Sequence, residues 1–294
     1  MVNHYCTAAE VKAAINFPDT GAPVDDDDIT TFIGYAEEEI ENIYKTKFGN
    51  VDIASTATSG STTTIVDSAA SYTADEYIGY VAWIHTGTNA GEYREITGND
   101  TTTLTVSPAF SAAVDNTSEF RITKLGYKSQ TVDGTGTDTY FVDYQPLINL
   151  VSLTVDSTSV TPSYVYQYKD EGRLLLGASG VEVSVFNSNE PQLVDIQYVY
   201  GVYPLPQIIK RLCIIIAGIR TLVAQIAGTY DDFTNVSLPG GFQASKGEPY
   251  TNVREAVATL QGEARGIIYG SQTVGTVGGD FRTNPSYRPY NLFG

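Results

Sequence analysis

Apolar residues near the start of the chain recur at the spacing typical of helices. Thr7 and Glu10 form a T-x-x-E capping box, which predicts that a short apolar helix begins just after Thr7. After the acidic run 25–28, apolar residues fall three or four positions apart from 29 to 44, which predicts a longer helix with one apolar face. The aspartates of the run then lie in the first helical turn, where the helix dipole favours carboxylates.

Helical spacing returns in the last third of the chain. Pro206 stands at a first-turn position, and residues 208–226 are apolar nearly all round the helix that they predict, up to Gly228. Such a helix must be buried on several sides. A further helix is predicted at about 251–269, because its apolar residues again recur at intervals of three and four.

Between these helices the pattern changes to the short runs typical of strands. From 51 to 123 the chain is rich in Thr, Ser and Gly, and the spacing of its runs predicts a small β-barrel or sandwich. A second β stretch covers 130–202, with clear apolar–polar alternation at 194–200. The predicted strands are 62–66, 80–85, 93–97, 103–106, 119–122, 140–142, 148–155, 163–168, 173–176, 181–186 and 194–200.

These patterns predict an α+β protein with a helical core of about four helices, a β section and an inserted small β-barrel or sandwich domain. The predicted segments are the N-terminal helices of the core at 1–50, the inserted β domain at 51–123, the β section at 124–203, the C-terminal helices of the core at 204–270, and an extended arm at 271–294.

The arm shows no periodicity, and its composition is that of an interface. Aromatic and arginine residues, which are enriched at protein interfaces, gather there, and no acidic residue follows Asp280. We expect this arm to dock on a partner; a disordered terminus is the alternative. The residues predicted to dock are Phe281, Arg282, Tyr287, Arg288, Tyr290 and Phe293.

The charge balance limits the possible partners. The 294 residues include 34 acidic and 17 basic side chains, which gives a net charge of −17. Affinity for DNA rests on cations that neutralise phosphates, so an acidic surface repels nucleic acid. We therefore expect no sequence-specific binding of DNA.

No catalytic constellation is visible, and we expect no enzyme activity, no cofactor and no metal. His4 and His85 are the two histidines, too few for an H-E-x-x-H motif or a zinc site of the usual type. The sequence Asp19-Thr-Gly-Ala22 matches the D-T-G-[SA] of aspartic proteases, but predicted helices flank it and no second copy exists. We interpret Asp19 as a loop residue, and the run 25–28 as a helix cap because it lacks the alternate spacing of a calcium loop.

Cysteine usage and hydropathy indicate a reduced, soluble protein. Cys6 and Cys213 lie far apart in unlike contexts, and we interpret both as thiols. The most hydrophobic segment, 212–219, is too short to span a bilayer, and residues 1–7 lack the pattern of a signal peptide. We expect no membrane partner.

Taken in order, the predicted elements resemble the head-to-tail connector (adaptor) proteins of tailed viruses. The resemblance rests on YCTAAEVK at 5–12, on 29–48 with IENIYKTKF at 40–48, on 140–156 with YQPLINLVS at 144–152, and on the strand 194–201 that leads into the apolar helix. The segment 51–123 departs from the compact family pattern and is similar to small β modules inserted in other virion proteins.

The resemblance implies a helical adaptor core and a structural role in the virion. Such a protein forms a homo-oligomeric ring of twelve subunits, docks on the portal protein and on the next tail-side ring protein, and lets genome DNA pass through the channel. It lies at the head–tail interface of the virion after assembly in the host cytoplasm. The apolar helix is then expected to supply ring contacts through Ile208, Leu212, Ile215, Ile216 and Ile219.

Two other interpretations stay open. The chain is alternatively another tail, baseplate or decoration protein, which would differ from the portal protein in copy number. A third interpretation, from a different class, is a carbohydrate- or surface-binding module that uses the tyrosine-rich β domain at 51–123.

Overall fold

The computed structural model describes residues 4–16, 24–49, 51–177, 183–189, 191–229 and 248–269. It divides the chain into two compact units. One, here called the sheet unit, comprises Lys45–Leu205; the other, here called the helical unit, combines His4–Tyr44 with the described residues that follow Leu205. The helical unit is therefore built from both ends of the chain.

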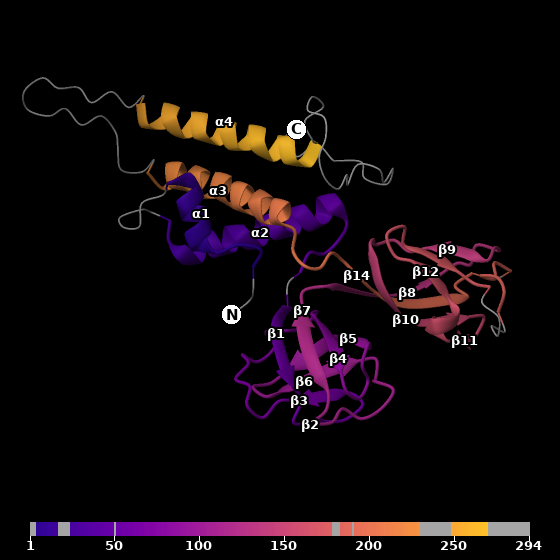
Figure 1. The fold of residues 1–294 in the computed structure, drawn as a ribbon. Helices are drawn as coiled ribbons and strands as arrows, with labels where there is room; N and C mark the ends of the chain where they lie inside the picture. Colours follow the sequence, from indigo (N-terminus) through magenta and orange to yellow (C-terminus); the bar gives the residue numbers. More distant parts are fainter. Residues whose placement is uncertain are drawn as a thin grey trace, which may run out of the picture. The chain divides into compact units, whose positions relative to one another are not determined.

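The described part of the helical unit contains four helices: α1 (Ala8–Ile15), α2 (Asp26–Tyr44), α3 (Gln207–Thr229) and α4 (Glu248–Tyr269). Helix α3 contacts each of the other three, as its apolar circumference requires (Figure 1). The capping box is confirmed, because the Thr7 side chain accepts the Glu10 N–H and the Glu10 side chain accepts the Thr7 N–H.

The first part of the sheet unit is one seven-stranded sheet of antiparallel pairs, curled into a half-barrel. Its strand order is β1-β7-β4-β5-β6-β3-β2. This sheet packs around one hydrophobic core, which includes the fully buried Phe120, Ile84 and Leu104. The strands are β1 (Val51–Thr56), β2 (Ser59–Gly60), β3 (Thr64–Val66), β4 (Val81–Thr86), β5 (Tyr93–Asn99), β6 (Thr103–Ser107) and β7 (Glu119–Thr123).

The second part of the sheet unit has two further sheets around a core of its own, which includes Tyr198 and Phe186. A four-stranded sheet in the order β11-β10-β14-β8 is formed by β8 (Gly126–Val132), β10 (Leu147–Val155), β11 (Thr158–Val160) and β14 (Val194–Tyr200). A three-stranded sheet in the order β12-β13-β9 is formed by β9 (Thr139–Phe141), β12 (Tyr166–Tyr168) and β13 (Arg173–Leu175), with the 3-10 turn η1 (Pro162–Tyr164) before β12.

The predicted fold class, a helical core carrying an inserted β-barrel or sandwich, was wrong. The chain is sheet-rich, with 31% of it in strands, and residues 51–123 form a single curled sheet. The physical reason lies in the burial of the segment after Thr123. The β section predicted there buries a large apolar cluster from Tyr140 to Tyr200 and so forms a hydrophobic core of its own.

Candidate interaction surfaces

The polar residues singled out in the sequence have structural roles where the structure describes them. Asp25 Oδ1 accepts the N–H groups of Asp27 (3.0 Å) and Asp28 (2.9 Å), so the acidic run caps α2 as predicted. His4 Nδ1 lies 3.2 Å from Oε2 of the buried Glu37. Asp19 lies outside the described residues.

Across the described ranges, no three His, Cys, Asp or Glu side chains gather into a group able to hold a metal ion. Across the same ranges, none of the helices combines the length and the hydropathy of a membrane span. Exposed apolar side chains among the described residues mark candidate surfaces for binding a partner.

Trp83 lies in a cross-strand row on the seven-stranded sheet. Strand β4, which carries Trp83, runs between β5 and β7. Tyr93 of β5 stacks on the indole with centroids 5.4 Å apart and planes 5° apart, and Arg121 Cζ of β7 lies 5.1 Å from the indole centroid. Because its two neighbours come from opposite sides, both faces of the indole are covered. His85 is exposed and meets the same indole edge-on at 5.1 Å.

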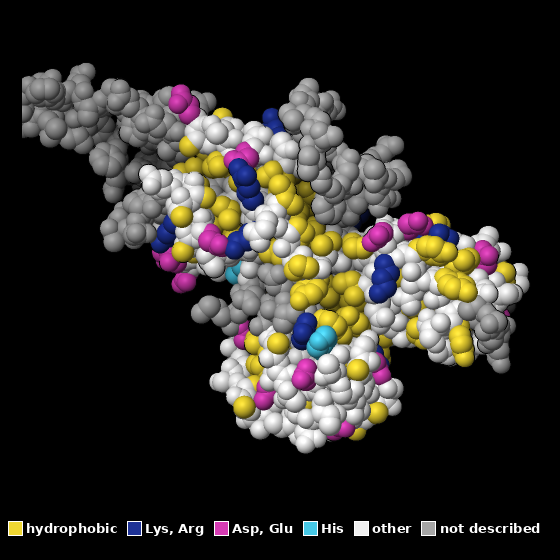
Figure 2. Space-filling view, in the orientation of Figure 1, with side chains coloured by type: hydrophobic (Ala, Val, Ile, Leu, Met, Phe, Trp, Pro, Cys, Tyr) yellow, Lys and Arg dark blue, Asp and Glu magenta, His cyan; other side chains and the backbone are white. Residues whose placement is uncertain are grey.

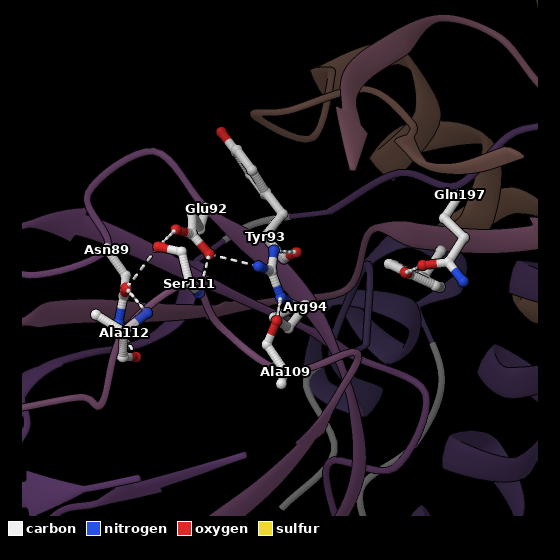
Figure 3. A network of polar contacts seen from close by, with 9 residues as sticks. Asn89, Glu92, Tyr93, Arg94, Ala109, Ser111, Ala112 and Gln197 are labelled. Atoms are coloured by element: carbon white, nitrogen blue, oxygen red, sulfur yellow. Dashed lines mark hydrogen bonds and ion pairs between the residues drawn. The ribbon is translucent and has the colours of Figure 1, made fainter. Parts of the chain in front are cut away.

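Figure 3 shows the polar network around Arg94 on β5. The guanidinium donates to the carbonyl of Ala109 (Nε, 3.0 Å), to the carbonyl of Tyr93 (Nη1, 2.8 Å) and to Glu92, and Glu92 also accepts the Ser111 N–H at 3.2 Å. Burial lowers the pKa of Arg94, while the carboxylate of Glu92 acts in the opposite direction. These contacts fasten the segment 109–111 to the sheet, so the network is structural.

The outer face of the three-stranded sheet is exposed and aromatic. Register places Tyr168, Arg173 and Phe141 directly across from one another, and Tyr166 lies two residues before Tyr168 on the same face of β12. Phe141 is 57% exposed, Tyr166 55% and Tyr168 40%. We call these four residues the aromatic face; hydrophobic side chains are visible over β9 and β12 in Figure 2.

A cation organises part of the aromatic face. Arg173 Cζ lies 3.6 Å from the centroid of the Tyr168 ring, and Arg173 Nε donates to Glu171 Oε2 at 2.9 Å. The opposite side of the sheet carries Leu174, fully buried in the core. Among the described residues, one face of this sheet is thus exposed and aromatic, and the opposite face packs on the core.

The helical unit carries a second exposed surface. Tyr35 of α2 is 50% exposed and Val223 of α3 is 51% exposed. Between them, Arg220 donates to Glu39 Oε2 at 2.9 Å and lies 5.8 Å from the centroid of the Tyr35 ring. Val223 follows Arg220 by three residues and so lies beside it on α3. We call Tyr35, Arg220 and Val223 the helical surface.

The residues predicted to make ring contacts occupy two kinds of place on α3. Leu212, Ile215 and Ile216 are buried inside the helical unit, where they form its own core. Ile219 is half-buried, and Ile208 is 45% exposed at the start of the helix. Of the five, Ile208 and Ile219 are thus the ones that keep exposed side-chain surface. The six arm residues predicted to dock lie outside the described residues.

Sequence reasoning missed two features. The aromatic face was not singled out, although the alternation Tyr164-x-Tyr166-x-Tyr168 is visible in the sequence. The proximity of the two cysteines, interpreted as thiols in unlike contexts, was also missed: Cys6 and Cys213 are both buried with their sulfur atoms 3.6 Å apart. No local signal links two cysteines so far apart in the chain.

Comparison with models of known protein families finds no match, and comparison with the sequences of curated proteins finds none either.

Proposed function

We propose that this chain is a structural subunit of a tailed-virus particle, in the ring that connects head to tail. The observation that carries the proposal is the pair of separate exposed surfaces, the aromatic face on the sheet unit and the helical surface on the helical unit. A cyclic ring with more than two subunits needs two different patches, because each copy presents one surface to its left neighbour and another to its right.

The composition of both surfaces supports this proposal. Tyrosine and arginine are the side chains most enriched among residues that dominate interface energies, and both surfaces contain them. The net charge of −17 fits a channel through which DNA passes without adhering. The order of elements that resembles connector proteins adds to these two arguments.

The first experiment counts copies of the chain in purified particles of the virus that encodes it, by quantitative mass spectrometry against the portal protein. Parity with the portal protein is expected for a connector ring. A large excess would move the chain to the tail tube or the capsid surface, and absence from the particle would overturn the proposal.

A second experiment tests the aromatic face directly. In the full chain, Tyr166→Asp places a charge on the proposed contact and is expected to abolish ring formation, measured by native mass spectrometry and electron microscopy. Ile78→Asp is the matched control, because Ile78 is 51% exposed and belongs to neither surface. Equal loss of rings in both variants would show that added charge alone, and no specific contact, is responsible.

The glycan-binding alternative receives less support from the geometry. A sugar ring stacks on an open aromatic face, and Trp83 has neither face open. Binding of the full chain on a glycan array, lost in Tyr166→Asp and kept in Ile78→Asp, would instead assign the aromatic face to carbohydrate.

A further inference from the structure

Two buried cysteines face each other across the helical unit. Cys6 lies in the short segment before α1, and Cys213 lies in α3. Their sulfur atoms are 3.6 Å apart although 207 positions separate them in the sequence, and the side chains are 3% and 0% exposed. A disulfide bond is about 2.05 Å long, so small adjustments of the two side chains bring the sulfur atoms within bonding distance.

The segment that carries Cys6 is held in place by carboxylates of α2. The Tyr5 N–H donates to the buried Glu37, and the Tyr5 hydroxyl donates to Glu41 Oε1 at 2.7 Å. On the other side of Cys6, the Thr7 side chain caps α1. The position of Cys6 against α3 is therefore fixed by contacts on both sides, which keeps the two thiols close together in the folded chain.

We propose that Cys6 and Cys213 are an oxidative modification site, at which a small-molecule disulfide converts the two thiols into an intramolecular disulfide. Closing this bond ties the segment before α1 to α3 and encloses the whole sheet unit in one covalent loop. The inference concerns the helical unit alone and does not depend on the proposed function.

The reaction is balanced with glutathione disulfide as the oxidant. Local opening of residues 4–7 exposes the Cys6 thiolate, which attacks glutathione disulfide, forms a mixed disulfide and releases one glutathione thiolate. When the segment closes again, the Cys213 thiolate attacks the Cys6 sulfur and releases the second glutathione. Two thiols lose two protons and two electrons, and one glutathione disulfide becomes two molecules of glutathione.

The test uses the full chain at low micromolar concentration, incubated with glutathione disulfide in the native state and, as a control, in 8 M urea. The native protein is expected to lose two hydrogen atoms in intact mass, to give a linked peptide containing Cys6 and Cys213, and to stay monomeric on a non-reducing gel. Denatured protein, whose cysteines are far apart on average, is expected to collect glutathione adducts instead.

Stability provides an independent readout. The thermal unfolding midpoint of the helices, followed by far-ultraviolet circular dichroism, is expected to rise on oxidation and to return after reduction with dithiothreitol. Cys6→Ser should abolish both the link and the shift. Three results for the native protein would each overturn the proposal: glutathione adducts alone, a disulfide that links two chains, or no change while the denatured chain reacts. These results do not depend on whether the Cys6→Ser variant folds.

Discussion

Replacing Gly126 by alanine would place a methyl group in steric overlap with the ring of Tyr200. The two residues face each other in the pairing of β8 with β14, and a Cβ built on Gly126 would lie 2.2 Å from Tyr200 Cζ. The ring has little room to withdraw, because it is 8% exposed and stacks on Tyr144 with centroids 4.7 Å apart. We expect overpacking to destabilise the sheet unit by about 1–3 kcal/mol.

An effect on the unfolded chain offsets part of this loss of stability. Alanine has less conformational freedom to lose than glycine in a strand, a difference of roughly 0.5–1 kcal/mol in its favour. The net change expected for Gly126→Ala is therefore a destabilisation of about 0–2.5 kcal/mol. Ser129→Ala, an exposed substitution in the same strand, should change the unfolding free energy by less than about 0.5 kcal/mol.

The assay is urea unfolding followed by tryptophan fluorescence. Trp83 is the only tryptophan of the chain and lies in the sheet unit, so the signal reports the unit that contains the substitution. A double-mutant cycle isolates the clash. In a Tyr200→Ala background the penalty of Gly126→Ala should vanish; a penalty that persists there would refute the steric explanation.

Three further outcomes are expected from the same fluorescence assay. Phe120→Ala should destabilise the seven-stranded sheet by about 3–5 kcal/mol, because Phe120 is 1% exposed in its core. Burial raises the pKa of Tyr198. The contribution of Tyr198 to the free energy of unfolding is therefore complete below the unfolded pKa of about 10 and is lost as pH rises beyond it. Tyr198→Phe should reduce that alkaline loss. Hydrogen bonds from Thr117 lower the pKa of Asp115. The contribution of Asp115 to the free energy of unfolding is therefore present above the unfolded pKa of about 3.9 and is lost on acidification. Asp115→Asn should make the free energy of unfolding less dependent on pH in the acid range.

Strong periodicity and local chemistry made the helices predictable. The capping box at Thr7 and the aspartate cap of α2 act within a few residues, so their outcome depends little on the rest of the fold. The strand β14 was equally clear, since its apolar residues alternate. Strand β8 was missed because its sequence GYKSQTV is largely polar and its side chains are mostly half-buried or exposed.

The sequence does not show which face of a sheet packs against the core. The pattern Tyr-x-Tyr occurs in β12 and again in β14. Tyr166 and Tyr168 are exposed, while Tyr198 and Tyr200 are buried in the core of the same unit. Alternation identifies a strand, but only the packing of the sheets decides which face meets water. The aromatic face and the pairing of Cys6 with Cys213 both depend on such long-range packing.

Charge repulsion between copies bears on how a ring of this chain would hold together. Each copy carries a net charge of −17, and like charges repel over a Debye length of about 8 Å at physiological ionic strength. Short-range contacts, such as those offered by the aromatic face and the helical surface, must outweigh that repulsion. Added salt screens the repulsion and leaves apolar contacts intact, so self-association should strengthen as salt rises. Self-association that weakens as salt rises would instead show that attraction between opposite charges holds the copies together, because salt screens attraction as well as repulsion. The sign of the salt dependence therefore tells whether short-range contacts or ion pairs dominate the association of copies.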